Sequence, residues 1–322
     1  MAVSQKQIAE KLGVSIALVS RVLSGRAREI GIAPDTIDRV LKAAGEMGYV
    51  PSAAALSLKG KATRTIGVAV YDFNDPFFGT LIQQIQAKAH EFNYSLILAG
   101  FLNRIPDEQD LQALYKHAID GLIVIGTESD ARWLESFHHM PIARIGHGGE
   151  CEQSVRISTD EESAARLLIN HLVETGRKNP VYTCANLPAH RLRSEVFVEV
   201  AADCGIALAV EQSSERNAFA AGEDAARQMI QAGTTADAFI CATDQVAMGA
   251  LHALVDAEID VPGQMAVTGF DDIPAAKQFI PSLTTIHQPL ATMVQQAFEA
   301  VMGPPPPQIL LVQGELVARK TT

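Results

Sequence analysis

The chain has 322 residues, of which 48% are hydrophobic and 20% charged. It is long enough for roughly two or three domains with packed cores, and too apolar to be disordered throughout. Its four cysteines are scattered without a C-x-x-C pair, no run of about 18 apolar residues occurs, and the N-terminal residues show no secretory pattern. We therefore expect a cytoplasmic protein that has no membrane segment, no disulfide framework, no bound metal and no cofactor.

The net charge of −11 is distributed unevenly along the chain. Residues 1–64 hold ten Lys and Arg against five Asp and Glu, which gives +5 and leaves −16 for residues 65–322. This asymmetry favours a basic head that binds polyanions and an acidic body with another task. Chance variation of surface charge explains the same numbers equally well, so charge alone does not decide.

The basic head contains a helix-turn-helix pattern. Ser4, with a glutamine three residues later, forms a capping box, and the short helix that follows ends at Gly13. Ser15 begins a second helix over 16–23, and a third is predicted over 34–47, where a proline suits the first turn. Any small three-helix bundle produces the same pattern, so the arrangement alone is a weak signal.

The acidic body alternates short apolar strands with amphipathic helices. Fully apolar strands of this kind form parallel sheets that are covered on both faces. Nine or ten strands in two series predict two doubly wound α/β subdomains, with the ligand outside the carboxyl ends of the strands, in a cleft between the lobes. The strands are predicted at 65–71, 95–100, 121–126, 141–146, 180–185, 206–210, 237–243, 265–270 and 308–319, and the helices at 76–93, 107–117, 130–138, 160–176, 190–205, 218–233 and 245–258.

Several motifs, in this order, resemble the LacI/GalR family of bacterial transcription regulators. They are QIAEKLGVSIALVSRVLSG, YVPSAAALSLKGK, TIGVAV and GFDDIPAAKQFIPSLTTIHQPL, and together they span nearly the whole chain. The resemblance implies a helix-turn-helix DNA-binding domain over 1–50 and a hinge helix with its linker over 51–63. It implies a two-lobed ligand-sensing and dimerisation domain of periplasmic-binding-protein type over 64–322.

By family position, the second helix of the head enters the major groove of operator DNA. The resemblance places Ile16, Ala17 and Arg21 at the DNA, where the apolar pair meets thymine methyl groups and the arginine reaches guanine or phosphate. Ser15 and Ser20 are candidates for phosphate contacts. For Ile16, packing inside the bundle is the alternative.

Residues 51–60, PSAAALSLKG, are too few for a stable isolated helix. In the family, the corresponding segment folds on operator DNA, where two hinge helices pair in the minor groove and a leucine wedges between base pairs. Leu58 matches that leucine, and Ala55 and Lys59 are further candidates for DNA contact. An ordinary linker helix with Leu58 packed against the body is the alternative.

The resemblance also implies a pocket motif after the first strand of the body. Asp75, Phe77 and Phe78 fit the family's Asn-Pro-Phe-Phe motif, with Asp75 in place of the asparagine. An aromatic ring at this place stacks on the face of a sugar ring. Packing at the helix start is the alternative for both phenylalanines.

Four further residues are candidates for the ligand site. Arg193 aligns with an arginine that grips ligand hydroxyls or a carboxylate in a bidentate fashion, and a surface arginine is the alternative. Asp271 matches an acidic residue that bonds sugar hydroxyls. Asp244 is expected to cap the helix that follows it and only touch the pocket, and Asn217 stands where many members carry an aromatic residue. Departures of this kind around the pocket leave the identity of the sugar open.

These features predict a ligand-responsive repressor and no enzyme, because the sequence has no G-x-S-x-G, P-loop, G-x-G-x-x-G or H-E-x-x-H motif. Its partners are expected to be operator DNA, a carbohydrate effector and a second copy of the chain. A dimer is expected, since no leucine heptad follows the last predicted strand. The alternative is a regulator whose effector is a partner protein, with a vestigial cleft.

Overall fold

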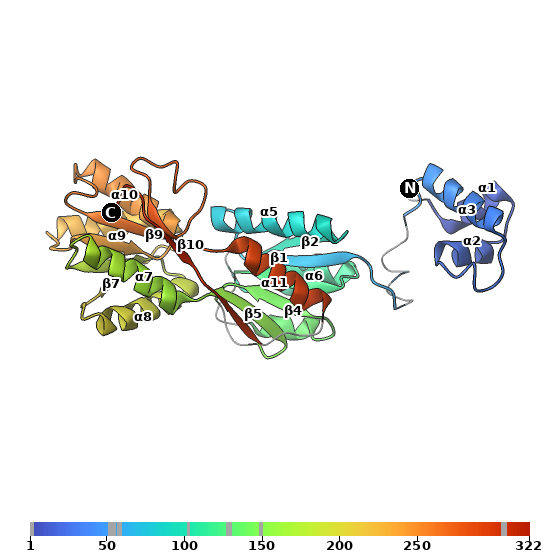
Figure 1. Ribbon diagram of the computed structural model, residues 1–322, viewed down its shortest axis with the longest axis horizontal. Helices are drawn as coiled ribbons and strands as arrows, with labels where there is room; N and C mark the ends of the chain where they lie inside the picture. Colours follow the sequence, from blue (N-terminus) through green and yellow to red (C-terminus); the bar gives the residue numbers. More distant parts are fainter. Residues whose placement is uncertain are drawn as a thin grey trace. The chain divides into compact units, whose positions relative to one another are not determined.

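The computed structural model describes residues 3–50, 56, 60–101, 104–126, 131–147, 151–303 and 308–322. Its chain divides into two compact units, Met1–Thr63 and Arg64–Thr322, whose elements are labelled in Figure 1. The first unit is helical, and the second contains two parallel α/β sheets. The predicted fold class is therefore confirmed.

The first unit is a three-helix bundle of α1 (Gln5–Leu12), α2 (Ile16–Leu23) and α3 (Pro34–Glu46). The predicted capping box is present, because the Ser4 hydroxyl accepts from the Gln7 backbone N–H and the Gln7 side chain accepts from the Ser4 N–H. One apolar residue from each helix is fully buried at the centre of the bundle: Ile8, Val19 and Val40.

The second unit has two six-stranded sheets. In the first sheet all neighbours are parallel, in the order β11 (Ile309–Val312), β5 (Ser154–Thr159), β4 (Ile142–Ile145), β3 (Gly121–Ile125), β1 (Thr65–Val70), β2 (Ser95–Gly100). In the second sheet only the first pair is antiparallel, in the order β12 (Glu315–Val317), β10 (Thr284–His287), β9 (Ala266–Asp271), β8 (Ala238–Cys241), β6 (Pro180–Cys184), β7 (Ala209–Gln212).

Helices cover both faces of the first sheet because its strands carry apolar side chains on both sides. Along β1, Ile66, Val68 and Val70 pack with α5 (Pro76–Glu91) and α11 (Leu290–Met302). The intervening Ala69 packs with the other face, where α6 (Glu108–Lys116) and the 3₁₀ helix η1 (Arg132–Phe137) lie. This alternation follows from the period of two along a strand.

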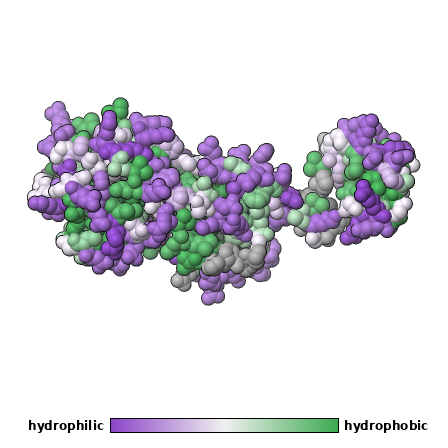
Figure 2. Space-filling model, viewed as in Figure 1, coloured by the Kyte–Doolittle hydropathy of each residue, from purple (hydrophilic) through white to green (hydrophobic). Residues whose placement is uncertain are grey.

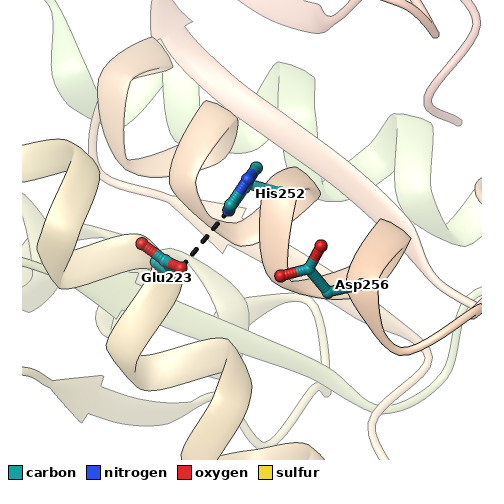
Figure 3. Close-up of side chains that lie close together, drawn as sticks. All are labelled: Glu223, His252 and Asp256. Carbon is teal, nitrogen blue, oxygen red and sulfur yellow. Dashed lines mark hydrogen bonds and ion pairs between the residues drawn. The ribbon is translucent and has the colours of Figure 1, made fainter.

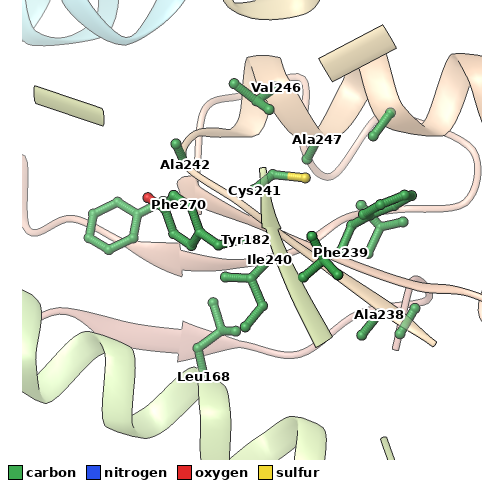
Figure 4. Packing of buried hydrophobic residues seen from close by; sticks show 14 of the residues in the cluster. Leu168, Tyr182, Ala238, Phe239, Ile240, Cys241, Ala242, Val246, Ala247 and Phe270 are labelled. Carbon is green, nitrogen blue, oxygen red and sulfur yellow. The ribbon is translucent and has the colours of Figure 1, made fainter. Parts of the chain in front are cut away.

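The second sheet is covered by two pairs of contacting helices. One pair is α7 (Glu161–Glu174) with α8 (Pro188–Asp203), and the other is α9 (Ala218–Gln231) with α10 (Asp244–Asp256). The second pair packs at close range, because a Cβ on Gly222 would overlap the Val246 carbonyl oxygen. Figure 4 shows the apolar core around β8, where Phe239 and Ile240 are fully buried.

The second unit differs from the sequence predictions in three ways. Residues 308–319 form two strands in different sheets, not one, because β11 pairs with β5 and β12 pairs with β10. Strands β5 and β10 were not predicted, since β5 carries serines and an arginine and β10 has four residues. The predicted helix over 130–138 is the 3₁₀ helix η1.

The chain therefore passes between the two sheets at three places: from β5 to α7, from β10 to α11, and from β11 to β12. Both lobes are built from segments far apart in sequence. Hydrophilic residues cover most of the visible surface in Figure 2. Among the described residues, no helix has the length and apolar character needed to cross a membrane.

Candidate functional site

The second helix of the first unit presents a face to solvent. The Ser15 hydroxyl caps α2 by accepting from the Leu18 N–H at 3.2 Å. Ile16, Ala17 and Arg21 are exposed, with Ile16 at 49%, whereas Val19 on the opposite face is buried. The exposure of Ile16 favours a surface role over packing inside the bundle. Ser20 is half-buried at the margin of this face.

The predicted hinge carries three candidate residues for DNA contact. Ala55, Leu58 and Lys59 lie outside the described residues. Their proposed roles in DNA binding remain predictions.

The second unit contains a cleft of about 340 Å³ at the carboxyl ends of strands from both sheets. Ligand pockets typically measure about 300–1,000 Å³, so a molecule of the size of a small sugar fits. Most of the wall is polar or aromatic. The lining includes Tyr71, Asp72, Asp75, Phe77, Phe78, His147, Ser158, Thr159, Glu161, His190, Arg193, Arg216, Asn217, Thr243, Asp271 and Gln288.

The motif after β1 forms one wall of the cleft. Asp75 caps α5, and its carboxylate accepts from the Phe77 N–H at 2.9 Å. Burial raises the pKa of Asp75 above its ordinary value, although this hydrogen bond opposes the shift. Phe77 and Phe78 meet edge to face at 5.6 Å, and Phe77 also packs against the apolar cores of both sheets. The two rings line the cleft and also pack with neighbouring apolar residues.

Arg193 of α8 reaches the cleft but is already bonded within the protein. Its Nε donates to Glu161 Oε1 at 2.7 Å, and one terminal nitrogen donates to the Ala242 carbonyl oxygen at 2.6 Å. The guanidinium carbon lies 3.8 Å from the centroid of the Phe270 ring. The alternative of a surface arginine is wrong, since the residue is buried.

Glu161 begins α7 and is the residue that holds Arg193. Burial alone would raise the pKa of its carboxyl, but the charge of Arg193, aided by His147, holds this pKa below its ordinary value. His147 Nε2 lies 2.8 Å from Glu161 Oε1. The second carboxylate oxygen, Oε2, is buried without a hydrogen-bond partner among the described residues. Sequence reasoning missed Glu161, because an acidic residue in the first turn of a helix is common.

Asp271 ends β9 and connects the two lobes through side chains. Its carboxylate accepts from the Gln288 amide at 2.7 Å, and the Gln288 carbonyl oxygen accepts from the Thr159 hydroxyl at 2.7 Å. Thr159 ends β5 of the first sheet, so the chain of hydrogen bonds joins strands of both sheets. Asp271 also has a φ of +120°. An ordinary residue in such a conformation costs on the order of 1–3 kcal/mol and is found at functional sites.

The charge state of Asp271 is set by its surroundings. Burial raises its pKa well above the ordinary value, and Arg193 opposes the shift. The carboxylates of Asp244 and Asp75 add to the increase. The Asp271 carboxyl also lines the cleft, where its oxygens can exchange hydrogen bonds with ligand hydroxyls.

Asp244 does not lie on the wall of the cleft. It is fully buried, and its carboxylate accepts from the Thr285 hydroxyl and from the Ile273 N–H at 2.8 Å. The predicted cap is wrong, because Thr243 caps α10 and Asp244 is the first residue of the helix. Burial raises the pKa of Asp244 to about 7. Its position is that of a structural residue beneath the cleft.

Asn217, a residue selected from the sequence, lines the cleft and caps α9 by accepting from the Ala220 N–H at 2.9 Å. Other residues of the wall were not selected from the sequence. Arg216 donates to the Tyr71 hydroxyl at 2.8 Å. His190 is buried, and burial lowers its pKa to about 3, so its ring is neutral and accepts from the Ala185 N–H. No local motif distinguishes these residues, because the fold alone brings them to one cleft.

One acidic cluster outside the cleft has the composition of a metal site. Figure 3 shows Glu223 of α9 near His252 and Asp256 of α10. Arg227, however, bonds Glu223 and Asp256 at 2.7 Å each. A guanidinium already supplies the positive charge there, so the cluster is an ion-pair network near the surface and carries no metal assignment.

Two family models match the chain. Residues 5–52 match the model of bacterial regulatory proteins of the lacI family, and residues 169–322 match a periplasmic binding protein-like domain. The HTH-type transcriptional regulator GalR of Escherichia coli (strain K12) is 30% identical over 313 residues, which cover 92% of this chain and 88% of GalR. The HTH-type transcriptional repressor PurR of Haemophilus influenzae (strain PittEE) is 30% identical over 306 residues, with 92% and 89% covered.

Solved structures match the same architecture. A crystal structure of the lac repressor dimer bound to operator and the anti-inducer ONPF has a TM-score of 0.84 at 25% identity, over 100% of this chain and 99% of that one. A LacI family protein from Silicibacter pomeroyi has a TM-score of 0.81 at 22% identity, over 99% of each chain, and supports the fold alone. The relatives GalR and PurR are transcription regulators, in agreement with the expectation that this chain is no enzyme.

Proposed function

The chain belongs to the LacI/GalR family of DNA-binding bacterial transcription regulators, and on that premise we propose that it is a repressor controlled by a carbohydrate. The proposal has two parts: an operator that the first unit reads, and an effector that the cleft binds. One observation carries it. The same chain has a helix-turn-helix with an exposed α2 face and a cleft formed by polar side chains from two sheets.

For DNA recognition, the proposal assigns the exposed face of α2 to the major groove. Ile16 and Ala17 supply apolar contacts, and Arg21 supplies a cation with hydrogen-bond donors. One short helix reads only a half-site, so two copies of the chain are needed on a pseudo-palindromic operator. We propose a homodimer that acts in the cytoplasm. The lac repressor structure, described as a dimer bound to operator, supports this part.

For control, the proposal assigns the effector to the cleft between the sheets. A ligand there touches groups of both lobes, such as Asp75 after β1 and Asp271 at the end of β9. It acts on DNA binding only if it binds two arrangements of the lobes with unequal affinity. A cleft of about 340 Å³ with many polar side chains favours a small molecule over a protein partner.

The experiment selects binding sites from genomic DNA and measures affinity by fluorescence anisotropy at two salt concentrations. Arg21→Ala should relax sequence discrimination, whereas Arg39→Ala, which removes an exposed charge from α3, should leave discrimination unchanged. No selected site above background would refute the regulator assignment. A thermal-shift screen with sugars, sugar acids and nucleosides tests the second part, and a cleft that accepts none favours a protein partner.

A further inference from the structure

Acidic side chains outnumber basic ones among the described residues of the cleft wall. These residues include four carboxyl groups, of Asp72, Asp75, Glu161 and Asp271, and two guanidinium groups, of Arg193 and Arg216. Because burial raises the pKa of Asp271 well above its ordinary value, the negative charge of the wall comes from the other three carboxylates. His190 adds no positive charge, because its pKa of about 3 keeps it neutral.

The positive charge at the centre of the cleft is already neutralised. Arg193 contacts Glu161 at 2.7 Å, and both side chains are more than nine-tenths buried. One terminal nitrogen of Arg193 also donates to the Ala242 carbonyl oxygen, which holds the guanidinium in place. An incoming phosphate or carboxylate would have to compete with Glu161 for the same cation, at the cost of placing two anions side by side.

The second guanidinium does not create an anion site either. Arg216 is bonded to the Tyr71 hydroxyl, on the wall that also carries Asp72 and Asp75. Burial raises the pKa of Asp75, and the charge of Asp72 adds to this increase. An anion at Arg216 would therefore meet two carboxylates of the same wall.

We propose that Glu161 is a specificity-determining residue that excludes anionic effectors from the cleft. The inference rests on the proposed function and narrows it: the effector is a polyhydroxyl compound without a phosphate or carboxylate group. Its hydroxyls donate to Asp271 and Asp75, and the terminal nitrogens of Arg193 donate to its oxygens without a net attraction for an anion. Ser158 and Glu161 belong to the lining, and the buried atoms Ser158 Oγ and Glu161 Oε2 have no hydrogen-bond partner among the described residues.

The test uses the full chain with sulfate as the probe, so that no effector needs to be known. Thermal unfolding is followed in sodium sulfate and in sodium chloride of equal ionic strength. The wild type should show no saturable sulfate effect. Glu161→Gln removes the competing charge and leaves Arg193 uncompensated. The apparent sulfate affinity of this variant should therefore exceed that of the wild type by about ten- to a thousandfold. A neighbouring charge shifts protonation equilibria over the same range.

Two variants serve as controls. Glu162→Gln removes the next carboxylate of the same helix, which is exposed and paired with Arg166, and should behave as the wild type does. Glu161→Gln combined with Arg193→Gln should lose the sulfate effect again. If Glu161→Gln fails to fold in chloride, recovery of its native circular dichroism in sulfate supports the proposal when the double variant does not recover. Because sulfate also stabilises folded proteins without binding a site, equal recovery of both variants, or recovery of neither, contradicts the proposal.

The outcomes separate the two proposals. Saturable sulfate binding by the wild type, or equal sulfate affinity of wild type and Glu161→Gln, would overturn the role of Glu161. Operator binding by the same wild-type sample is measured in parallel. If the sulfate experiment overturns the role of Glu161 while the wild type still binds operator, only the proposed effector class is rejected. If the wild type does not bind operator, the proposed function is rejected.

Discussion

Breaking the ion pair between Arg193 and Glu161 from one side should strongly destabilise the second unit. Both side chains are buried, and Arg193 Nε lies 2.7 Å from Glu161 Oε1. Two unit charges about 4 Å apart interact by roughly 4 kcal/mol at an effective dielectric constant near 20. Removing one partner leaves the other charge buried, so Arg193→Met and Glu161→Leu should each lower the free energy of unfolding by about 3–5 kcal/mol.

The double variant should lose much less than the sum of the two single variants. Replacing a buried pair by apolar residues is often nearly neutral, so a double-mutant cycle should give a coupling free energy of at least about 2 kcal/mol. Urea unfolding followed by circular dichroism at pH 7 measures it. The exposed pair Glu162–Arg166 on the same helix is the control, with about 0.3–0.5 kcal/mol expected. Coupling below about 1 kcal/mol for the buried pair would refute the reasoning.

The pH dependence of this coupling follows from the lowered pKa of Glu161. A depressed carboxyl pKa stabilises the folded state above the unfolded pKa of about 4.3, and the contribution is lost as the pH falls through the folded value. The coupling should therefore be constant from about pH 7 to pH 5 and shrink below about pH 4. Growth of the coupling on acidification would contradict the assigned charge state.

Four further predictions concern DNA, effector, stability and assembly. Leu58→Ala should weaken operator binding more than binding to random DNA, because a wedge acts only at the correct base step; equal losses in anisotropy titrations would contradict this. Asp271→Asn should abolish the effector response while operator affinity stays nearly intact; a response at wild-type effector concentrations would remove Asp271 from the site. Burial raises the pKa of Asp244 to about 7, so wild-type stability should fall as the pH rises from about 4 to 7, and Asp244→Asn should flatten this slope in thermal melts; an unchanged slope would place the titration elsewhere. Light scattering at micromolar concentration should give a mass near 69 kDa, twice the chain mass of 34.5 kDa, whereas 138 kDa would indicate a tetramer.

Local pattern determined most of the secondary structure. Short sequence patterns were enough to predict three elements: the capping box at Ser4, the helix over 16–23 and the fully apolar strand TIGVAV. Cap chemistry acts between neighbours in sequence, and a short continuous apolar run predicts a strand that is buried on both faces. The order of these elements was sufficient for the fold class and for the position of the cleft at the strand ends.

Tertiary structure decided which side chains share the cleft and what charge they carry. Glu161 resembles any acidic residue at a helix start, yet it neutralises Arg193, which lies 32 residues further on. Asp244 resembles a helix cap, yet the fold buries it against Thr285. The strand over 308–319 divides between two sheets because its halves find partners in β5 and β10. Pairing and burial depend on the distance between residues in space, and in this chain the segments that meet are separated by dozens of residues in sequence.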